Sequence, residues 1–276
     1  GTISYQYDAL GRQTSMQAPG QAAVSYGYDA ASRLTAITQG AQLASLNYDA
    51  AARRTRLTLP NGVSTEYGYD AASRLTALIY RNAQDALGDL TYHYDTAGNR
   101  IAVGGSFART LLPDAVASAS YDPANRQLLF GDKAIAFDAN SNVTAILDGS
   151  GDMTLAWDAR NRLRAVTAAG QSSTFQYDAL GRRQVATRNG EETAYLHDGV
   201  EIVQELALAG PVSILHSRLV DEVLVRSGAA FHLSDALGST IALRARYEIS
   251  VPDDGSLAAR VSHGWWPRRQ FDDGSG

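Results

Sequence analysis

The sequence predicts an all-β fold in which repeated antiparallel β-hairpins stack edge to edge into a long sheet. Two observations support this. An aromatic–aspartate pair recurs at intervals of about 20 residues, and apolar and polar residues alternate on both sides of it. The alternation is clear in the segments 24–28 and 34–38, and a two-residue period is typical of strands rather than helices.

The aromatic–aspartate pair defines the repeat. It occurs at Tyr7-Asp8, Tyr28-Asp29, Tyr48-Asp49, Tyr69-Asp70, Tyr94-Asp95, Tyr121-Asp122, Phe137-Asp138, Trp157-Asp158 and Tyr177-Asp178, with His197-Asp198 as a weaker copy. An arginine usually follows five or six residues after the aromatic: Arg12, Arg33, Arg53, Arg74, Arg100, Arg126, Arg162 and Arg182. Self-similarity at a fixed period indicates a repeat architecture, so these tyrosines, aspartates and arginines are expected to define its structure.

Turn sequences separate the two strands of each unit. The aspartate opens stretches such as DALGR, DAASR and DARNR, where its carboxylate can accept backbone N–H groups in an Asx-turn. Glycine or asparagine near the fourth position suits the positive φ that such a turn requires. A second break closes the other end of the unit, and Asn61-Gly62 and Asn189-Gly190 are strong hairpin signals there.

The repeat positions predict specific contacts. Equivalent tyrosines are expected to form a ladder of ring contacts along the sheet. Each arginine is expected to stack on a neighbouring ring or to pair with an aspartate of its own or the next unit. The longer units place extra residues at 81–90 and 104–120, which we expect to be loops.

The unit YD-x-x-G-R resembles the YD repeat of the Rhs proteins, which also occurs in the shell subunits of insecticidal Tc toxins and in teneurins. The resemblance covers roughly residues 1–200. The segment from Phe231 to Thr240 is similar to the start of the Rhs core-associated region, which places residues 201–243 there. The resemblance implies a curved spiral sheet that closes, over many more repeats, into a shell around a C-terminal toxic domain. In the family, self-cleavage at a PDPxG motif releases that domain.

The end of the sequence departs from that family. Residues 244–276 show neither the repeat period nor PDPxG, and Val251–Gly255 does not fit the motif. We therefore expect a fragment truncated before the self-cleavage motif, with a divergent, irregular tail. Ten hairpins are too few to close a shell, so the predicted sheet is open and can self-associate through its edges.

Composition excludes several classes of protein. Lys+Arg 24 against Asp+Glu 29 gives a net charge of −5, which offers no electrostatic reason to bind nucleic acid. Without cysteine there is no disulfide, thiolate metal site or cysteine nucleophile. Neither an apolar run long enough for a transmembrane helix nor a signal peptide is present in the sequence.

No residue is assigned a catalytic, cofactor-binding or metal-binding role. The histidines, His93, His197, His216, His232 and His263, do not have metal-ligand spacing. Asp148–Asp152 imitates the start of a calcium loop but has Met153 and Ala159 where glycine and glutamate are required, so we predict a turn. The acidic pairs Glu191-Glu192 and Asp253-Asp254 are read as solvated turn residues.

Three functions remain open. The first is a structural fragment of an Rhs-type shell for a toxic partner, secreted or delivered by a secretion system in bacterial competition. Its partners are a toxin domain or further repeat segments of a longer chain. The second is an extracellular, cell-surface module whose tyrosines, including Tyr7, Tyr28, Tyr48 and Tyr69, bind glycans, or that binds another protein. The third is a hydrolase whose residues converge only in three dimensions. Trp265-Trp266, with Arg268 and Arg269, could anchor a partner.

Overall fold

The computed structural model describes residues 2–83, 85–108, 115–149, 151–219, 221–227, 230–244 and 249–250. All regular structure in these residues is β-strand, so the all-β prediction is confirmed. The chain divides into two compact units: unit 1 comprises residues 1–111 and 213–276, and unit 2 comprises residues 112–212. The sequence-based boundaries after residues 200 and 243 rest on repeat similarity and stay a prediction.

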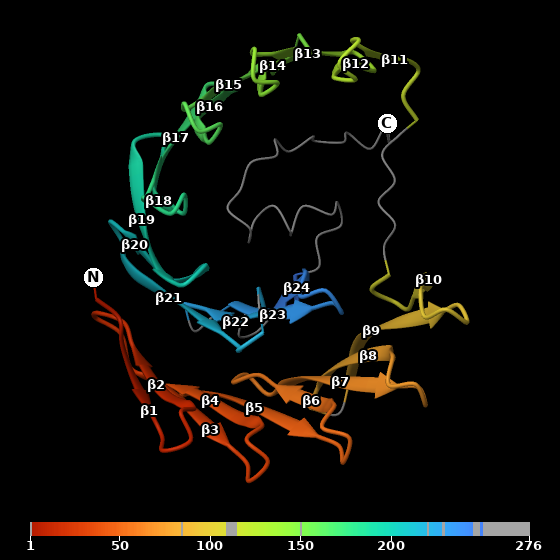
Figure 1. The fold of residues 1–276 in the computed structure, drawn as a ribbon, viewed down its shortest axis with the longest axis vertical. Coiled ribbons are helices and arrows are strands. Elements are labelled where there is room, and N and C mark those ends of the chain that lie inside the picture. Colours follow the sequence, from red (N-terminus) through yellow and green to blue (C-terminus); the bar gives the residue numbers. More distant parts are fainter. Residues whose placement is uncertain are drawn as a thin grey trace, which may run out of the picture. The chain divides into compact units, whose positions relative to one another are not determined.

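Unit 1 contains a ten-stranded antiparallel sheet in which every strand pairs with its neighbour in sequence (Figure 1). Its strands are β1 (Ser4–Tyr7), β2 (Gln13–Gln17), β3 (Val24–Tyr28), β4 (Leu34–Gln39), β5 (Gln42–Tyr48), β6 (Arg54–Thr58), β7 (Val63–Tyr69), β8 (Leu75–Asn82), β9 (Asp85–Tyr94) and β10 (Arg100–Gly104). One hairpin per repeat unit follows the predicted pattern. The sheet remains open, with β1 and β10 as its edges.

A second run of antiparallel strands completes unit 1. It contains the part of β21 (Gly210–His216) from residue 213 on, β22 (Val223–Arg226), β23 (Ala230–Ser234), β24 (Thr240–Arg244) and the short β25 (Ile249–Ser250). We call residues 213–243 the returning segment, because it lies far from the ten-stranded sheet in the sequence but packs on it in the structure (Figure 1). β25 lies inside the predicted irregular tail; Val251–Gly255, Asp253-Asp254, His263, Trp265-Trp266, Arg268 and Arg269 lie outside the described residues.

Side chains from both layers form the core of unit 1. Ile37, Leu78 and Tyr80 of the ten-stranded sheet are fully buried, as are Leu224 and Leu233 of the returning segment. The Tyr80 hydroxyl donates a hydrogen bond to the Ser234 carbonyl at 2.8 Å, which satisfies the one polar atom of this buried ring. The returning segment thus covers the apolar face that a single sheet leaves exposed.

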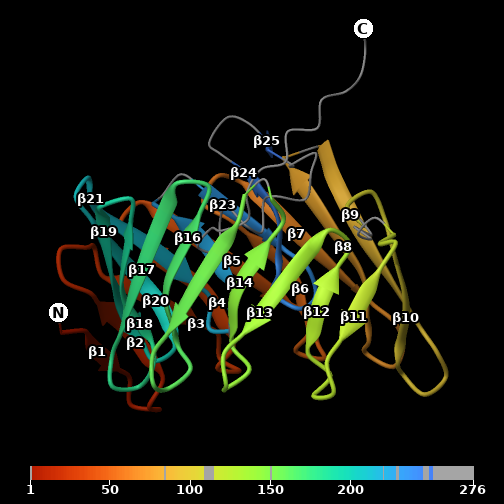
Figure 2. The ribbon, with the colours of Figure 1, turned by 90° about the horizontal axis from the view of Figure 1, so that it is seen from above.

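Unit 2 repeats the hairpin pattern. Its strands are β11 (Ala119–Tyr121), β12 (Gln127–Phe130), β13 (Lys133–Phe137), β14 (Val143–Leu147), β15 (Met153–Trp157), β16 (Leu163–Ala168), β17 (Gln171–Tyr177), β18 (Arg183–Arg188), β19 (Glu191–Asp198) and β20 (Glu201–Ala207). Figure 2 shows β11–β17 side by side. Burial alternates along β17, where Ser173 and Phe175 are buried between exposed neighbours. We call the face that carries these two buried side chains the inner face of this sheet.

Each repeat turn contains one residue in the left-handed region, four positions after the aromatic. Glycine fills this position in some turns, as in Gly11 (φ 74°), but Ser32 and Ala52 (both φ 61°) fill it in others. The predicted preference for glycine or asparagine is therefore only partly met. The register of the hairpin also shifts at each aromatic, as between Gly27 and Tyr28, so the bulge belongs to the repeat.

Replacing Ala52 with glycine should raise the free energy of unfolding of unit 1 by about 1 kcal/mol, because alanine is strained at positive φ. Urea unfolding followed by circular dichroism measures the change. Ala51→Gly, in the same turn, is the matched control and should be neutral or destabilising. An equal gain from both variants would contradict the assignment of the strain to Ala52.

The prediction of a loop at residues 81–90 is wrong. Most of this stretch belongs to the hairpin of β8 and β9, in which Asn82 pairs with Asp85. Alternating inward residues explain why: Leu78, Tyr80, Leu90 and Tyr92 are buried on one face. At Gly88 a β-carbon would lie 2.5 Å from the Phe107 ring, so a larger residue there would displace that ring.

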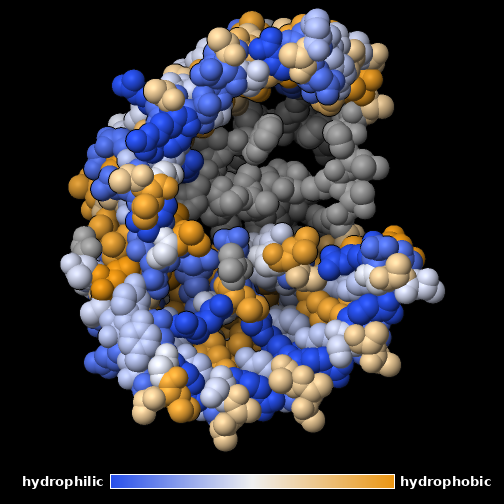
Figure 3. All heavy atoms as spheres, viewed as in Figure 1, coloured by the Kyte–Doolittle hydropathy of each residue, from blue (hydrophilic) through white to orange (hydrophobic). Residues whose placement is uncertain are grey.

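In the second predicted loop, residues 104–120, Gly104 ends β10 and Ala119–Ser120 belong to β11. Residues 105–108 form a turn that places Phe107 on Tyr80, and residues 109–114 lie outside the described residues. Figure 3 shows hydrophilic residues interspersed with apolar ones along the turns of both units. Turns of this mixed character suit contact with water.

Candidate functional site

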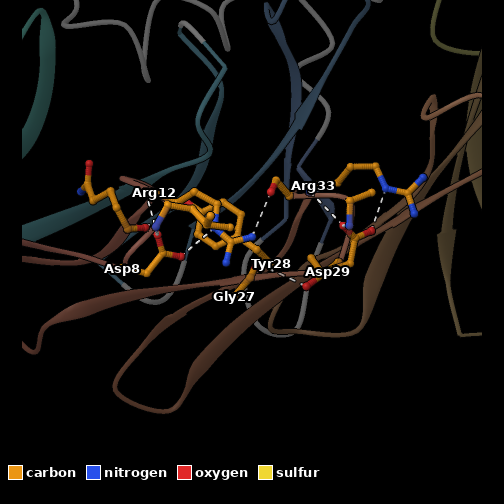
Figure 4. Close-up of polar contacts among 11 residues, drawn as sticks. Asp8, Arg12, Gly27, Tyr28, Asp29 and Arg33 are labelled. Atoms are coloured by element: carbon orange, nitrogen blue, oxygen red, sulfur yellow. Dashed lines mark hydrogen bonds and ion pairs between the residues drawn. The ribbon is translucent and has the colours of Figure 1, made fainter.

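The aspartate of each repeat organises its own turn. Asp29 accepts backbone N–H bonds from Ala31 and Arg33 on Oδ1, both at 2.9 Å, and the Arg33 Nε on Oδ2 at 2.7 Å (Figure 4). The same carboxylate–arginine pair at 2.6–2.7 Å recurs six more times: Asp8–Arg12, Asp49–Arg53, Asp70–Arg74, Asp122–Arg126, Asp158–Arg162 and Asp178–Arg182. The Asx-turn therefore fixes where the guanidinium points.

The arginine reaches forward to the next hairpin. The Arg33 guanidinium carbon lies 5.1 Å from the centroid of the Tyr48 ring, and its Nη1 donates to the Asp49 carbonyl at 3.0 Å. Six arginines cover the next repeat aromatic at 4.8–5.3 Å: Arg12 on Tyr28, Arg33 on Tyr48, Arg53 on Tyr69, Arg74 on Tyr94, Arg126 on Phe137 and Arg162 on Tyr177. One side chain thus joins two units.

The aromatic reaches back. The Tyr48 hydroxyl donates to the Leu34 carbonyl of the preceding hairpin at 2.8 Å. Equivalent bonds of 2.7–2.9 Å are Tyr28 to Gln13, Tyr69 to Arg54, Tyr94 to Leu75, Trp157 Nε1 to Val143, and Tyr177 to Leu163. We call this set of contacts, from the aspartate through the arginine to the next aromatic, the clasp. The clasp has a direction, because arginine points forward and the aromatic hydroxyl points back.

The predicted ladder of tyrosine rings does not form among the described residues, where the ring pair observed is Tyr80–Phe107 at 5.5 Å. Neither residue is a repeat aromatic. The reason is strand spacing: equivalent rings are two strands apart, about 10 Å, which exceeds the reach of a direct ring contact. The guanidinium fills that gap.

The clasp also shifts pKa values. The backbone N–H of Arg33, followed by its side chain, lowers the pKa of Asp29 despite partial desolvation. The Arg12 backbone N–H has the same effect on the pKa of Asp8. Burial raises the pKa of Tyr48 and Tyr69. Asp8 and Asp29 are therefore ionised, and Tyr48 and Tyr69 neutral, at physiological pH.

Replacing Arg33 with glutamine should destabilise unit 1 by about 1–2 kcal/mol, because it removes an ion pair, a ring contact and a hydrogen bond to the next turn. Arg160→Gln is the control, since this exposed turn arginine is outside the clasp. Thermal unfolding by circular dichroism compares the two variants. Equal effects would show that the clasp adds nothing beyond net charge.

Two rings at the start of a sheet are not clasped. Tyr7, on edge strand β1, is 60% exposed, and Tyr121, on the first strand of unit 2, is 57% exposed. In the last hairpin of the ten-stranded sheet, Asn99 takes the position of the clasp arginine, and its side chain donates to Asp95 Oδ2 of its own turn at 2.9 Å. The forward contact is missing where the ten-stranded sheet ends.

The hairpin frame continues beyond the recognised repeats. Asp235 opens a repeat turn, with Leu237 and Ser239 N–H groups on its Oδ1, although serine replaces the arginine. The register shift that marks the aromatic position falls at His216 and Ser234. Ser234 has no ring, and no aspartate follows His216, so the sequence pattern missed both positions; the segment DALGS was the available signal.

No group of three His, Asp or Glu side chains in the described part of the chain could hold a metal ion. Asp148 instead pairs with Lys133 at 3.0 Å, and Asp152 Oδ1 accepts the Gly149 N–H, which closes a turn. His93 lies on β9 and His197 on β19. In the described residues, no helix has the length and apolar character needed to cross a membrane.

A family model, the RHS repeat, matches residues 7–43, 48–85 and 157–194. These segments contain complete clasps, and together with the fold they define a repeat protein of the hairpin-sheet class. The three matched segments carry the RHS repeat, as the sequence resemblance indicated. No curated protein sequence matches it.

Solved structures of Tc toxin assemblies share its fold. The crystal structure of TcdB2-TccC3-Cdc42 matches with a TM-score of 0.57 and 17% identity over 90% of this chain. TcdB2-TccC3 matches with a TM-score of 0.54 and 17% identity over 90%. The Photorhabdus luminescens Tc holotoxin pore matches with a TM-score of 0.51 and 17% identity over 88%. This chain spans 17–18% of the length of those chains.

Proposed function

We propose that this chain is a structural segment of a toxin-encapsulating shell, which carries a toxic partner delivered to competitor cells outside the producing cell. Its immediate partners are further YD-repeat segments, and the partner it carries is a toxin domain. The fold shared with Tc toxin structures supports this role, and so does a repeat architecture that is structural rather than catalytic. The sheet is built to extend, because each hairpin positions the contacts for the next.

The observation that carries the proposal is the pair of unclasped rings. Every contact that Tyr28 makes with the hairpin before it, the guanidinium over its ring and its hydroxyl on a carbonyl, is a contact that Tyr7 on the β1 edge can offer to another hairpin. The edge strand also presents unpaired backbone groups for strand addition. Tyr121 presents an equally exposed ring on β11. A YD hairpin bearing an arginine fits both rings.

Binding of a labelled peptide with the sequence of residues 42–61, which includes Asp49 and Arg53, tests this proposal. Fluorescence anisotropy with the full chain should show binding that is lost when Tyr7 and Tyr121 are both changed to alanine. A peptide carrying Arg53→Gln should bind more weakly. If the affinity is unchanged by the substitutions of Tyr7, Tyr121 and Arg53, the edges are not sites for further repeats.

Glycan binding is the competing function. The clasp places a guanidinium on one face of Tyr28, Tyr48 and Tyr69, which leaves those faces closed to a sugar ring. A glycan array decides between the two: binding that disappears in Tyr28→Ala and Tyr69→Ala variants of intact fold would replace the shell by a binding module. A panel of ester and glycoside substrates covers the hydrolase alternative.

A further inference from the structure

We propose that two copies of this chain join head to tail, with edge strand β10 of one copy pairing with edge strand β1 of the next. The inference rests on the proposed function where it uses β1 as a docking edge, and it adds β10 and a defined partner, a second copy. Both strands lie in unit 1, at the opposite edges of its ten-stranded sheet. Because that sheet is open, the two edges meet only between copies.

The hairpins of both sheets join their neighbours in one constant register. The residue three positions after the clasp arginine, or after the asparagine that replaces it, lies opposite the residue three positions before the next repeat aromatic. Ser15 and Ser25 are such a pair, aligned on Arg12 and Tyr28. The same alignment holds at seven other joins: Ala36–Ser45, Arg56–Glu66, Ala77–Thr91, Leu129–Ala134, Ala145–Thr154, Ala165–Thr174 and Val185–Ala194. The register therefore predicts how a further hairpin joins the sheet.

This register makes the two edges of unit 1 complementary. For a join between β10 and β1, the aligned residues are Asn99 and Tyr7. Val103 of β10 then lies opposite Ile3, which directly precedes β1. Val103 is 50% exposed and Ile3 is half-buried, so each edge presents an apolar side chain at the position where the other does.

The interior joins of the ten-stranded sheet show what this position does when it is paired. The four corresponding pairs are Met16–Val24, Ile37–Ala44, Leu57–Thr65 and Leu78–Leu90, and all eight side chains are buried. Pairing of a second copy would bury Val103 and Ile3 in the same way. Burial of this apolar surface favours the association.

The backbone of neither edge is protected against strand addition. β1 (SYQY) and β10 (RIAVG) contain neither proline nor lysine, the residues that commonly blunt an edge strand. The charged side chain on β10, Arg100, lies over the Tyr92 ring of its own hairpin, with its guanidinium carbon 4.4 Å from the centroid. In the described residues β10 pairs only with β9, and β1 only with β2, so each strand retains one open side.

An asparagine at the clasp position is compatible with such a join. At the β14–β15 join Asn142 takes this position, and the two strands pair nevertheless. The aromatic of the next hairpin still reaches back there, since Trp157 Nε1 donates to the Val143 carbonyl at 2.7 Å. The equivalent bond between two copies runs from the Tyr7 hydroxyl to the Arg100 carbonyl.

The side chains favour β1 over β11, the edge strand that carries the other exposed repeat tyrosine. The same alignment on Tyr121 would place Ala117 opposite Val103, where β1 offers Ile3. The larger isoleucine buries more apolar surface against the valine. A head-to-tail dimer presents one β1 and one β10 at its ends, so further copies can add to it.

Sedimentation velocity of the full chain over a range of concentrations tests the pairing. The unchanged chain should associate as its concentration rises. Val103→Lys and Ile3→Lys should each weaken this association at least about tenfold, because the lysine would face an apolar side chain. The matched control is Leu43→Lys, since Leu43 is 51% exposed but lies on interior strand β5; it should leave association within about twofold. Circular dichroism verifies that the variants fold.

Mixing the two lysine variants separates head-to-tail pairing from pairing of like edges. Val103→Lys retains an intact β1, and Ile3→Lys retains an intact β10. The mixture should therefore form a dimer with one copy of each variant, which cannot grow because both outer edges carry the lysine. A mixture that stays monomeric, or either variant associating alone as strongly as the unchanged chain, overturns the proposal.

Cysteine cross-linking tests the register, since the chain contains no cysteine. A short bismaleimide should capture a mixture of Ala102→Cys and Ser4→Cys as a dimer, and should capture Val103→Cys with Ser4→Cys about tenfold less, because a shift of one residue changes the face. Equal capture of both mixtures, or equal capture of Ala102→Cys by Ser118→Cys beside β11, overturns the proposal. Docking of the hairpin peptide at Tyr7 does not use β10 and should survive Val103→Lys, so this failure is distinguishable from failure of the proposed function.

Discussion

Replacing Glu222 with leucine is expected to lower the free energy of unfolding of unit 1 by about 3–5 kcal/mol. Glu222 and Arg54 form a bidentate pair in which the side chains are only 10% and 12% exposed. The leucine variant leaves the guanidinium buried without its counter-charge. Urea unfolding with hydrogen exchange of β6, β7 and β22 measures the loss.

The charge of Arg54 depends on this partner. Burial alone would lower the pKa of the guanidinium, but the hydrogen bonds and charge of Glu222, helped by Tyr67, outweigh burial and raise the pKa. Burial in turn raises the pKa of Tyr67 to about 12, so its hydroxyl stays neutral and bonds to Arg54 at 3.1 Å. Without Glu222, the buried positive charge has no compensating carboxylate.

The double variant Arg54→Met/Glu222→Leu supplies the decisive control. Apolar residues of similar size can replace a buried ion pair at little cost, so most of the lost stability should return. The half-exposed pair Arg81–Glu66, at 2.9 Å, provides a matched comparison in the same unit. Arg81→Met should cost less than about 1 kcal/mol. If the Glu222 and Arg81 variants cost the same, the returning segment is not held by the buried pair.

The hairpin frame could be predicted because its causes are local. The alternation of 24–28, the Asp29 turn and the hairpin signal at Asn61-Gly62 each act within a few residues, and all three predicted features are present. The sequence predicts that each arginine pairs with an aspartate or stacks on a ring. In the structure one arginine makes both contacts, as Arg33 does with Asp29 and Tyr48. Strand spacing alone would have argued against the tyrosine ladder, since one hairpin adds two strands to the sheet.

The inner contacts could not be predicted, because they join distant parts of the chain. Arg54 and Glu222 are 168 residues apart, and Tyr80 and Ser234 are 154 apart. No period links such pairs. Ser234 occupies the aromatic position without a ring, and His216 occupies it without a following aspartate, so the register shift identifies both where the aromatic–aspartate pattern does not. The extended hairpin of β8 and β9 was hidden by the asparagine, aspartate and glycine in 81–90, which signal a turn locally while the inward residues form strands.

Lowering the pH from 7.5 to 4.5 is expected to reduce the free energy of unfolding of unit 1, through His232 alone, by most of about 3 kcal/mol. His232 lies on β23 with 3% exposure, its Nδ1 is 3.1 Å from Thr240 Oγ1, and its Nε2 is buried without a partner among the described residues. Burial, followed by the charges of His216 and Arg226, lowers its pKa from 6.5 to about 4. Below pH 6.5 the unfolded chain therefore takes up a proton that the folded chain cannot hold, so stability falls as the pH falls. The interval between the two pKa values, at about 1.4 kcal/mol per pH unit, sets the magnitude.

Urea unfolding of unit 1, followed by hydrogen exchange of β22–β24, should show this loss between pH 6.5 and pH 4.5. His232→Phe keeps a buried ring that cannot be protonated, so it should flatten the pH dependence even if it changes stability at pH 7.5. The clasp aspartates do not contribute to the stability change between pH 6.5 and pH 4.5. Their pKa values are lowered from 3.8, as for Asp29, and their contribution is lost only at still lower pH. A pH dependence that persists in His232→Phe would assign the acid sensitivity to another group. Its disappearance would locate the acid-labile point of unit 1 in the returning segment, which covers the core of the ten-stranded sheet.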